Sequence, residues 1–191
     1  ELAIELIAHT EGHLELATID LFTREFQRGS LLTVGELWAI PTMFRLGLVE
    51  NIRRMALRVM SRTREVELAD DWARRLRDAS ERTPQALADD LAAFVDSHPP
   101  LTPAFVTRFL QQIRSYQTDF TPLLWLEQWM AEDGMSHEAA AASSNQRLAI
   151  TQITVANSIT SLRAIARLDW QGFVESQSVV EQGLREDAAR L

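Results

Sequence analysis

The chain has 191 residues, of which 46% are hydrophobic and 24% charged, a balance that excludes a disordered protein and predicts a globular core. Its net charge of −8 argues against a general nucleic-acid binder, because domains that contact phosphates are usually basic. All 19 positive charges are arginines and cysteine is absent, which excludes lysine-dependent catalysis, thiolate nucleophiles, disulfides and cysteine metal sites.

The chain begins with an acidic, amphipathic segment and without an initiator methionine. This start is unlike a signal peptide, and it is what we expect of a piece of a larger multidomain protein. The uncharged run Leu148–Leu162 contains several threonine, serine, glutamine and asparagine residues. It is too short and too polar for a membrane span, which needs about 20 apolar residues.

Helix signals occupy the first part of the chain. A helix is predicted from about Leu14 to Arg28, with Gly29 in the left-handed conformation that closes many helices. Thr33 and Glu36, three residues apart, form the capping-box pattern that begins another helix.

That next helix is predicted to continue to about Ser80, with a possible break at residues 61–63. Pro41 lies inside it and predicts a kink, because proline cannot donate the backbone hydrogen bond. Residues Leu37–Val49 are apolar on nearly every side, so we expect other helices to surround them.

Further caps predict helices in the second half of the chain. Each of three threonine-proline pairs fits an N-cap followed by proline at the first helical position. A long helix is expected from about Ser136 to Leu168, followed by one capped by Asp169 and one begun by Ser178 with Glu181. The three pairs are Thr83–Pro84, Thr102–Pro103 and Thr121–Pro122.

The predicted fold is therefore all-α, a multi-helix bundle or an array of α-hairpins around a long, proline-kinked central helix. We expect residues 1–191 to form a single all-helical domain, with possible sub-parts at residues 1–82 and 83–191.

Two groups of residues could be taken for metal or nucleotide-sugar sites. His9 and His13 would share a helix face, but two ligands alone do not make a metal site. The acidic pair Asp70 and Asp71 lies in a helical pattern beside arginines, which favours ion pairs on a helix surface. We therefore predict no catalytic residue and no metal site.

A basic run could contact anionic lipid headgroups or an acidic partner, although a solvated stripe is the more common reason for such a run. We expect Glu50 to pair with Arg54 within it. The run consists of Arg53, Arg54, Arg58, Arg62 and Arg64.

Arg45 and Arg163 follow apolar neighbours and are predicted to be buried. Each would then make an internal ion pair or line a polar pocket between helices, since a buried guanidinium needs a carboxylate. Trp38 is expected to pack in the core, as are Trp125 and Trp129, whereas Trp170 is expected to be partly exposed.

Two blocks of sequence resemble the cyclic β-1,2-glucan synthetase family. The first is Gly35–Arg54, GELWAIPTMFRLGLVENIRR, in which Phe44 replaces the leucine that we expect. In the second, Val174 stands where an aromatic residue is common. The second block comprises Asn157–Arg163, Asp169–Trp170, Phe173, Glu175, Ser178, Glu181, Leu184–Arg185 and Asp187.

The resemblance implies a large membrane protein that builds cyclic β-1,2-glucan from UDP-glucose, with a divalent metal, at the cytoplasmic face of a bacterial inner membrane. The similar region looks like the helical region that precedes the glycosyltransferase module, and none of the family's catalytic motifs is present. The resemblance therefore implies a non-catalytic scaffold that needs no cofactor and packs against other modules of the same polypeptide.

A carbohydrate-binding element is the alternative, because aromatic faces stack on sugar rings while charged and amide groups bond hydroxyls. Docking to an anionic membrane surface through the basic run is a second, weaker alternative. The residues predicted to line a groove for glucan are Glu36, Trp38, Arg45, Asn51, Arg163, Asp169 and Trp170.

Overall fold

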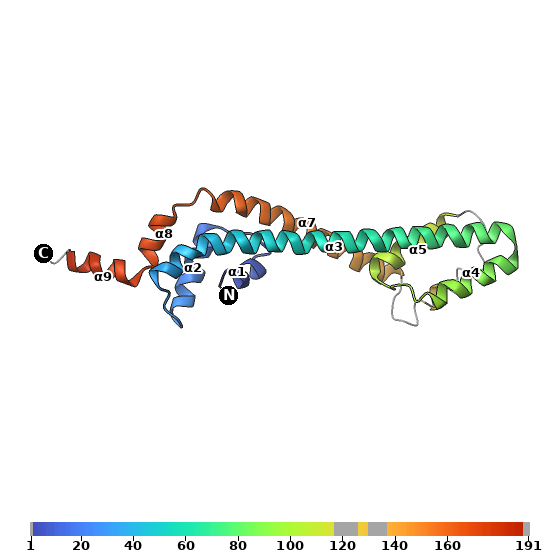
Figure 1. The fold of residues 1–191 in the computed structure, drawn as a ribbon, viewed down its shortest axis with the longest axis horizontal. Helices are drawn as coiled ribbons and strands as arrows, with labels where there is room; N and C mark the ends of the chain where they lie inside the picture. Colours follow the sequence, from blue (N-terminus) through green and yellow to red (C-terminus); the bar gives the residue numbers. More distant parts are fainter. Residues whose placement is uncertain (1, 117–125, 130–136, 189–191) are drawn as a thin grey trace. The chain divides into compact units, whose positions relative to one another are not determined.

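The computed structural model describes residues 2–116, 126–129 and 137–188 (Figure 1). These residues form α-helices joined by turns and short extended segments, and the described part of the chain contains no strand. The all-α prediction is confirmed. In chain order the helices are α1 (Leu2–His9), α2 (Leu16–Gln27), α3 (Val34–Arg82), α4 (Pro84–Asp96), α5 (Pro103–Ser115), α7 (His137–Ile165), α8 (Trp170–Gln177) and α9 (Val179–Ala188).

The predicted capping box is present at the start of α3. The backbone N–H of Thr33 donates to Glu36 Oε2 at 2.8 Å, and the N–H of Glu36 donates to Thr33 Oγ1 at 3.2 Å. The hydrogen bond from the Thr33 backbone lowers the pKa of Glu36, because it favours the charged carboxylate. Two N–H groups that the helix leaves without a partner are thereby satisfied.

Side-chain caps also begin α4, α5 and α8. Thr83 Oγ1 accepts from the N–H of Ala86 at 3.1 Å, and Thr102 Oγ1 accepts from that of Phe105 at 3.3 Å. Asp169 accepts from the N–H of Gly172 in the same way. The caps predicted at these positions are confirmed, whereas the pair at residues 121–122 lies outside the described residues.

Two local predictions are wrong. Gly29 is not left-handed, because α2 ends at Gln27 with Arg28 still in the right-handed helical conformation. Helix α3 also has no break at residues 61–63 and stays helical through Pro41. Proline removes one hydrogen bond near the N-terminal end of α3, and the 41 residues that follow it continue the helix.

The chain divides into two compact units. Unit 1 comprises Glu1–Ala56 and Thr151–Leu191, and unit 2 comprises Leu57–Ile150. Helices α3 and α7 each contribute residues to both units. Whether residues 1–191 fold as a single domain remains a prediction.

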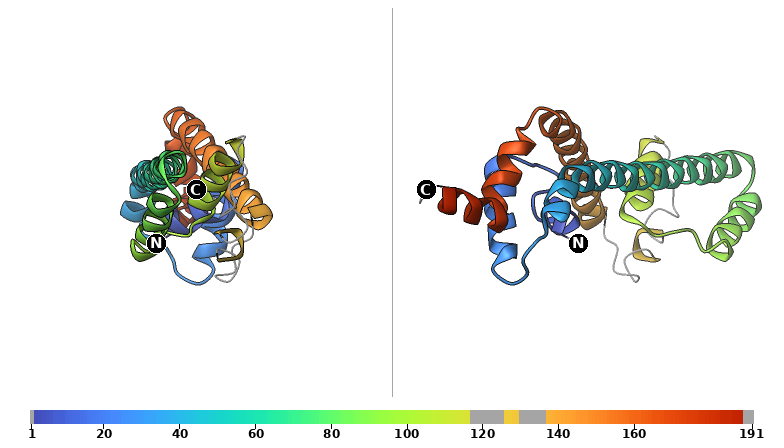
Figure 2. Two further views of the ribbon diagram at one scale, coloured as in Figure 1. Left: turned by 90° about the vertical axis from the view of Figure 1, so that its right-hand side faces the viewer. Right: turned by 60° about the vertical axis from the view of Figure 1, so that its left-hand side comes forward.

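The core of unit 1 joins α1, α2, α8 and the unit-1 residues of α3 and α7. Helices α2 and α8 lie side by side in it (Figure 2). Each buried leucine, isoleucine or phenylalanine stabilises the fold by about 1.5–3 kcal/mol relative to an exposed one. The buried side chains are Ala3, Leu6, Ile7, Leu14, Ile19, Leu37, Ile40, Phe44, Leu48, Ile165, Phe173 and Val174.

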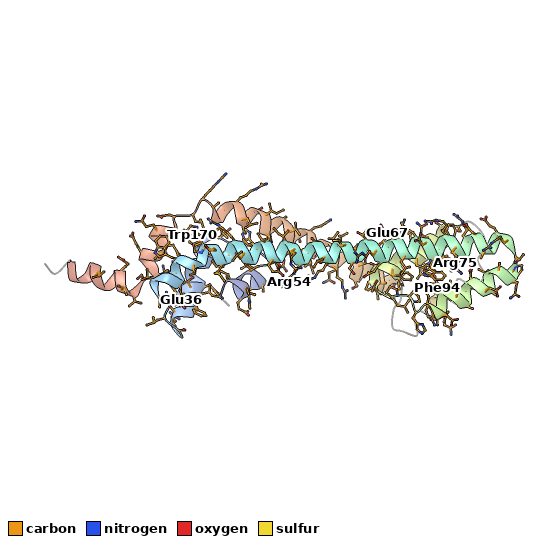
Figure 3. All side chains as sticks on the ribbon, viewed as in Figure 1. Glu36, Arg54, Glu67, Arg75, Phe94 and Trp170 are labelled. Carbon is orange, nitrogen blue, oxygen red and sulfur yellow. The ribbon has the colours of Figure 1, made fainter. Side chains whose placement is uncertain are left out.

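Unit 2 has an aromatic core centred on Phe94, which Figure 3 labels. The ring of Phe94 stacks on that of Phe109, with 5.0 Å between the centroids, and Phe105 stacks on Phe109 at 5.6 Å. Trp72 and Trp129 contact Phe94 edge-on. The core position predicted for Trp129 is confirmed, and Trp125 lies outside the described residues.

The prediction that helices enclose residues Leu37–Val49 on every side is wrong. The buried side chains recur every three or four residues and form a single stripe along α3, which includes Leu37, Phe44 and Leu48. Trp38 and Leu46, on other sides of the helix, are exposed. Hydrophobic residues all around a helix do not reveal which of them find a partner.

Asp70, on α3, forms an ion pair with Arg108 on α5 within unit 2. It accepts hydrogen bonds from Arg108 Nε at 2.6 Å and from Gln112 Nε2 at 3.0 Å. Partial burial alone would raise the pKa of Asp70, but the bonds from Arg108 and Gln112 and the charges of Arg108 and Arg74 outweigh it, so this pKa is lowered. Ion pairing was predicted for Asp70 along the surface of its own helix, and the structure shows that Asp70 instead pairs with Arg108 on α5.

Replacing Asp70 with asparagine is expected to reduce the free energy of unfolding at pH 7 by about 1 kcal/mol. Because the pKa is lower in the folded state, the carboxylate stabilises the fold above its unfolded pKa of about 3.9 and loses this effect as pH falls through the folded value. Asp70→Asn should therefore lose less stability than the unchanged chain between pH 7 and pH 3 in urea denaturation.

Asp71→Asn is the matched control, because Asp71 pairs along the surface of α3 itself, with Arg74 at 3.0 Å. It should change the slope of stability against pH much less than Asp70→Asn does. Equal slopes for both variants would show that the contacts of Asp70 with α5 contribute nothing to acid sensitivity.

Candidate functional site

All seven residues predicted to bind glucan lie in unit 1. Four of them, Glu36, Asn51, Asp169 and Trp170, make contacts that build the fold. Glu36 and Asp169 cap α3 and α8, as described above. Trp170 is half-buried, its indole N–H donates to the carbonyl of Ile165 at 2.9 Å, and its ring meets that of Phe173 edge-on at 5.5 Å. Figure 3 labels Trp170 on α8 and Glu36 in the first turn of α3.

Asn51 lies beside the turn between α1 and α2, next to polar side chains of α7. Its side-chain amide donates to Ser158 Oγ at 3.2 Å, and Ser158 Oγ donates to the carbonyl of Thr154 at 2.7 Å. Ser161 Oγ accepts from the backbone N–H of Leu14 at 2.8 Å. Short polar side chains of α7 therefore bind a segment almost 150 residues away in the sequence.

Arg45 and Arg163 are both exposed, so the prediction that they are buried is wrong. Arg45 follows Phe44 by one residue, which turns it about 100° away from the buried stripe of α3. Arg163 lies two residues after the buried Ser161 and two before the buried Ile165, on the opposite side of α7. Among the residues that the structure describes, no carboxylate is buried, so neither arginine is needed to stabilise one.

Trp38 has 50% of its surface exposed, which corrects the prediction that it packs in the core. Residues seven apart on a helix share a face, so Trp38 lies on the same side of α3 as Arg45. Val49, four residues further along, is also exposed there. This face combines an open aromatic ring with a guanidinium group.

The structure also shows a hollow of about 230 Å³ in unit 1 that the sequence did not indicate. Gln27 Nε2 donates to the carbonyl of Gln177 at 3.1 Å, and the amide of Gln177 donates to Asp20. Arginine and amide groups there suit a ligand with hydroxyl or anionic oxygens. The lining residues are Arg24, Gln27, Arg28, Ser176, Gln177 and Val179.

No local pattern in the sequence could have found this hollow. Its two glutamines are 150 residues apart, and each appears in the sequence as an ordinary polar helix residue. Gln177 is almost fully buried, which indicates that its amide first serves to join α8 to α2.

The basic run is only partly available for a partner. Glu50 pairs with Arg53 at 2.7 Å, and this hydrogen bond lowers the pKa of Glu50. The hydrogen bond of Glu50 thus goes to Arg53 instead of Arg54, although the charge of Arg54 also lowers the pKa of Glu50. Arg62 donates to the backbone and hydroxyl oxygens of Ser144 on α7. Docking of the run to anionic lipid remains a prediction.

Within the described ranges, no three histidine or acidic side chains come close enough together to hold a metal ion. None of the helices in the same ranges has the length and apolar character needed to cross a membrane.

Comparison with known proteins identifies the class to which this all-helical chain is related. No protein-family model matches the chain. A curated glucan synthase, however, matches over 185 residues, which is 94% of the chain, with 32% identity. This confirms the resemblance to the cyclic β-1,2-glucan synthetase family, at moderate identity.

The relative is the cyclic β-(1,2)-glucan synthase NdvB of Rhizobium meliloti (strain 1021). The chain spans only 6% of the length of that protein. It is thus related to one segment of a cyclic glucan synthase, in agreement with the two blocks that carry the resemblance.

Proposed function

We propose that the chain is a non-catalytic helical scaffold segment of a cyclic β-1,2-glucan synthase. The continuous match along 94% of the chain to such a synthase carries the proposal. The contacts of the candidate residues support it, since Glu36 and Asp169 cap helices, Asn51 bonds Ser158 on α7 and Trp170 packs against the core of unit 1. These side chains serve the fold before they serve any ligand.

The proposed role places the chemistry in other modules of the same polypeptide. Those modules would polymerise glucose from UDP-glucose with the help of a divalent metal, at the cytoplasmic face of a bacterial inner membrane. The segment would pack against them and keep them in position. Exposed apolar side chains in both units, such as Leu46 and Leu68, provide surface for such contacts.

A chimera tests this role. The chain replaces the matching segment of the Rhizobium meliloti synthase, and membranes are assayed for glucan formed from UDP-glucose and for the amount of synthase. We expect the chimera to accumulate and to make glucan, and deletion of the segment to reduce both. A second chimera that carries Phe94→Ala should lose protein and glucan together, because a scaffold acts through its fold.

Two results would contradict the proposal. One is turnover of UDP-glucose, or hydrolysis of a β-1,2-glucan, by the 191-residue chain alone. The other is a deletion variant that keeps full synthase level and full glucan output.

Glucan binding is the second candidate, and the exposed face with Trp38 and Arg45 favours it. An open indole ring stacks on sugars, while a guanidinium donates to hydroxyl groups. Calorimetry with linear β-1,2-glucan should show binding that Trp38→Ala weakens at least tenfold. The matched control is Leu21→Ala, an exposed apolar residue of α2. No heat at millimolar glucan would exclude this role.

A further inference from the structure

The hollow in unit 1 has a lining whose charge is opposite to that of the chain as a whole. It lies between the end of α2 and the junction of α8 with α9. Of the described residues that line it, Arg24 and Arg28 are basic and none is acidic. The chain itself carries a net charge of −8. A concave site with cationic walls in an acidic protein attracts anions.

Both arginines keep free N–H groups for a ligand. Arg24 pairs with Asp20 at 2.6 Å and Arg28 with Glu25 at 2.7 Å, and each of these contacts is made by one terminal nitrogen of the guanidinium. A guanidinium has five N–H donors, so most of them remain available. The two acidic partners do not line the hollow, whereas the arginines do. The guanidinium groups are therefore the charges that a ligand in the hollow meets.

Gln177 and Val179 add further hydrogen-bond donors. The Gln177 side chain is buried, its amide nitrogen donates to Asp20, and its amide oxygen accepts from Gln27. One of its two amide N–H groups therefore has no protein partner among the described residues. Buried polar groups normally find a partner, so this N–H suits a bound acceptor. Val179 begins α9, whose first backbone N–H groups carry a positive partial charge.

This set of donors fits a phosphoryl group better than a sugar. Each hydroxyl of a sugar also donates a hydrogen bond, whereas the lining offers mainly donors. Phosphoryl oxygens only accept, and they pair with guanidinium groups in bidentate geometry. The volume of about 230 Å³ is also below the roughly 300 Å³ at which pockets for drug-sized ligands begin, which favours one small group over a glucan chain.

We propose that the hollow binds a phosphoryl group. Arg24 and Arg28 neutralise its charge, the free amide N–H of Gln177 donates to one of its oxygens, and the N-terminal end of α9 faces it with Val179. The proposal goes beyond the scaffold role, because it assigns a ligand to unit 1 itself.

Titration with inorganic phosphate tests the site. Calorimetry of the 191-residue chain at low ionic strength should show saturable binding, and Arg28→Gln should weaken it at least tenfold. Arg53→Gln is the matched control, because Arg53 pairs with Glu50 three residues away at 2.7 Å, as Arg28 does with Glu25. It should change the dissociation constant less than twofold. No binding at tens of millimolar phosphate, or equal losses for the two variants, would overturn the proposal.

A charge placed in the hollow separates binding from folding. Val179→Glu puts a carboxylate at the first position of α9, where an acidic residue stabilises a helix, so urea denaturation should show no loss of stability. Repulsion between like charges should nevertheless weaken phosphate binding at least tenfold. Val180→Glu is the control, since Val180 is also exposed but does not line the hollow. Equal weakening by both variants would show that phosphate responds only to the charge of α9 and would contradict the site.

Two further titrations identify the source of the phosphoryl group. Tighter binding of glycerol 1-phosphate than of inorganic phosphate would support the site and assign it to an organic phosphate ester. Equal affinities would support the site and assign it to free phosphate. Glycerol has no phosphoryl group and should not bind. If glycerol binds as tightly as glycerol 1-phosphate, the hollow recognises hydroxyl groups and the proposal is wrong.

Discussion

Replacing Phe94 with alanine is expected to lower the free energy of unfolding of unit 2 by about 3–5 kcal/mol. Its side chain is fully buried, and its ring contacts those of Phe105, Phe109, Trp72 and Trp129. Truncation removes the ring at the centre of this group and leaves a cavity that stacked rings cannot close without losing their geometry. The loss is a large part of the stability of an ordinary domain.

Urea denaturation followed by near-ultraviolet circular dichroism measures this effect, because the signal reports the packing of the aromatic rings. Phe26→Ala is the control of equal size, and it should cost much less, since Phe26 is 37% exposed. If the two units unfold separately, only the transition of unit 2 should move. A loss below 1 kcal/mol for Phe94→Ala would show that the aromatic cluster adds little to stability.

The features that could be predicted from the sequence are those in which cause and effect lie within a few residues. A capping box depends only on Thr33 and Glu36, and a proline at the first helical position depends only on the threonine before it. The caps of α3, α4, α5 and α8 were therefore predictable, as was the helical class of the fold.

The features that could not be predicted depend on which side of a helix finds a partner. Arg45 has apolar neighbours on both sides in the sequence, yet it is exposed because only one stripe of α3 is covered. Likewise, Gln177 and Ser158 look like ordinary polar residues until the fold brings Gln27 and Asn51 to them. Contacts between residues more than 100 positions apart leave no local pattern in a single sequence.

The turn between α1 and α2 combines both kinds of information, because its backbone needs glycine while its partners come from α3 and α7. Gly12 is buried and has φ +79°, a conformation that a residue with a side chain adopts at a cost of about 1–2 kcal/mol. A Cβ atom at this position would lie 2.5 Å from Ser158 Oγ and 3.4 Å from Asn51 Nδ2. Ser158 cannot easily move, because its hydroxyl bonds Thr154 and Asn51.

Gly12→Ala is therefore expected to lower the free energy of unfolding by about 2–4 kcal/mol, as the sum of backbone strain and overpacking. Thermal and urea denaturation measure the loss. Gly35→Ala is the matched control, since Gly35 lies in the first turn of α3 with no atom within 4 Å of the added Cβ. It should leave stability unchanged or raise it by about 0.5–1 kcal/mol.

A double-mutant cycle separates the two causes of the loss at Gly12. Ser158→Ala removes the oxygen that the new Cβ would meet, but it leaves the backbone conformation of the turn as it is. In that background Gly12→Ala should cost only the strain of about 1–2 kcal/mol, so the two changes should be less than additive. Equal costs in both backgrounds would show that φ alone requires glycine and that the turn does not pack closely against α7.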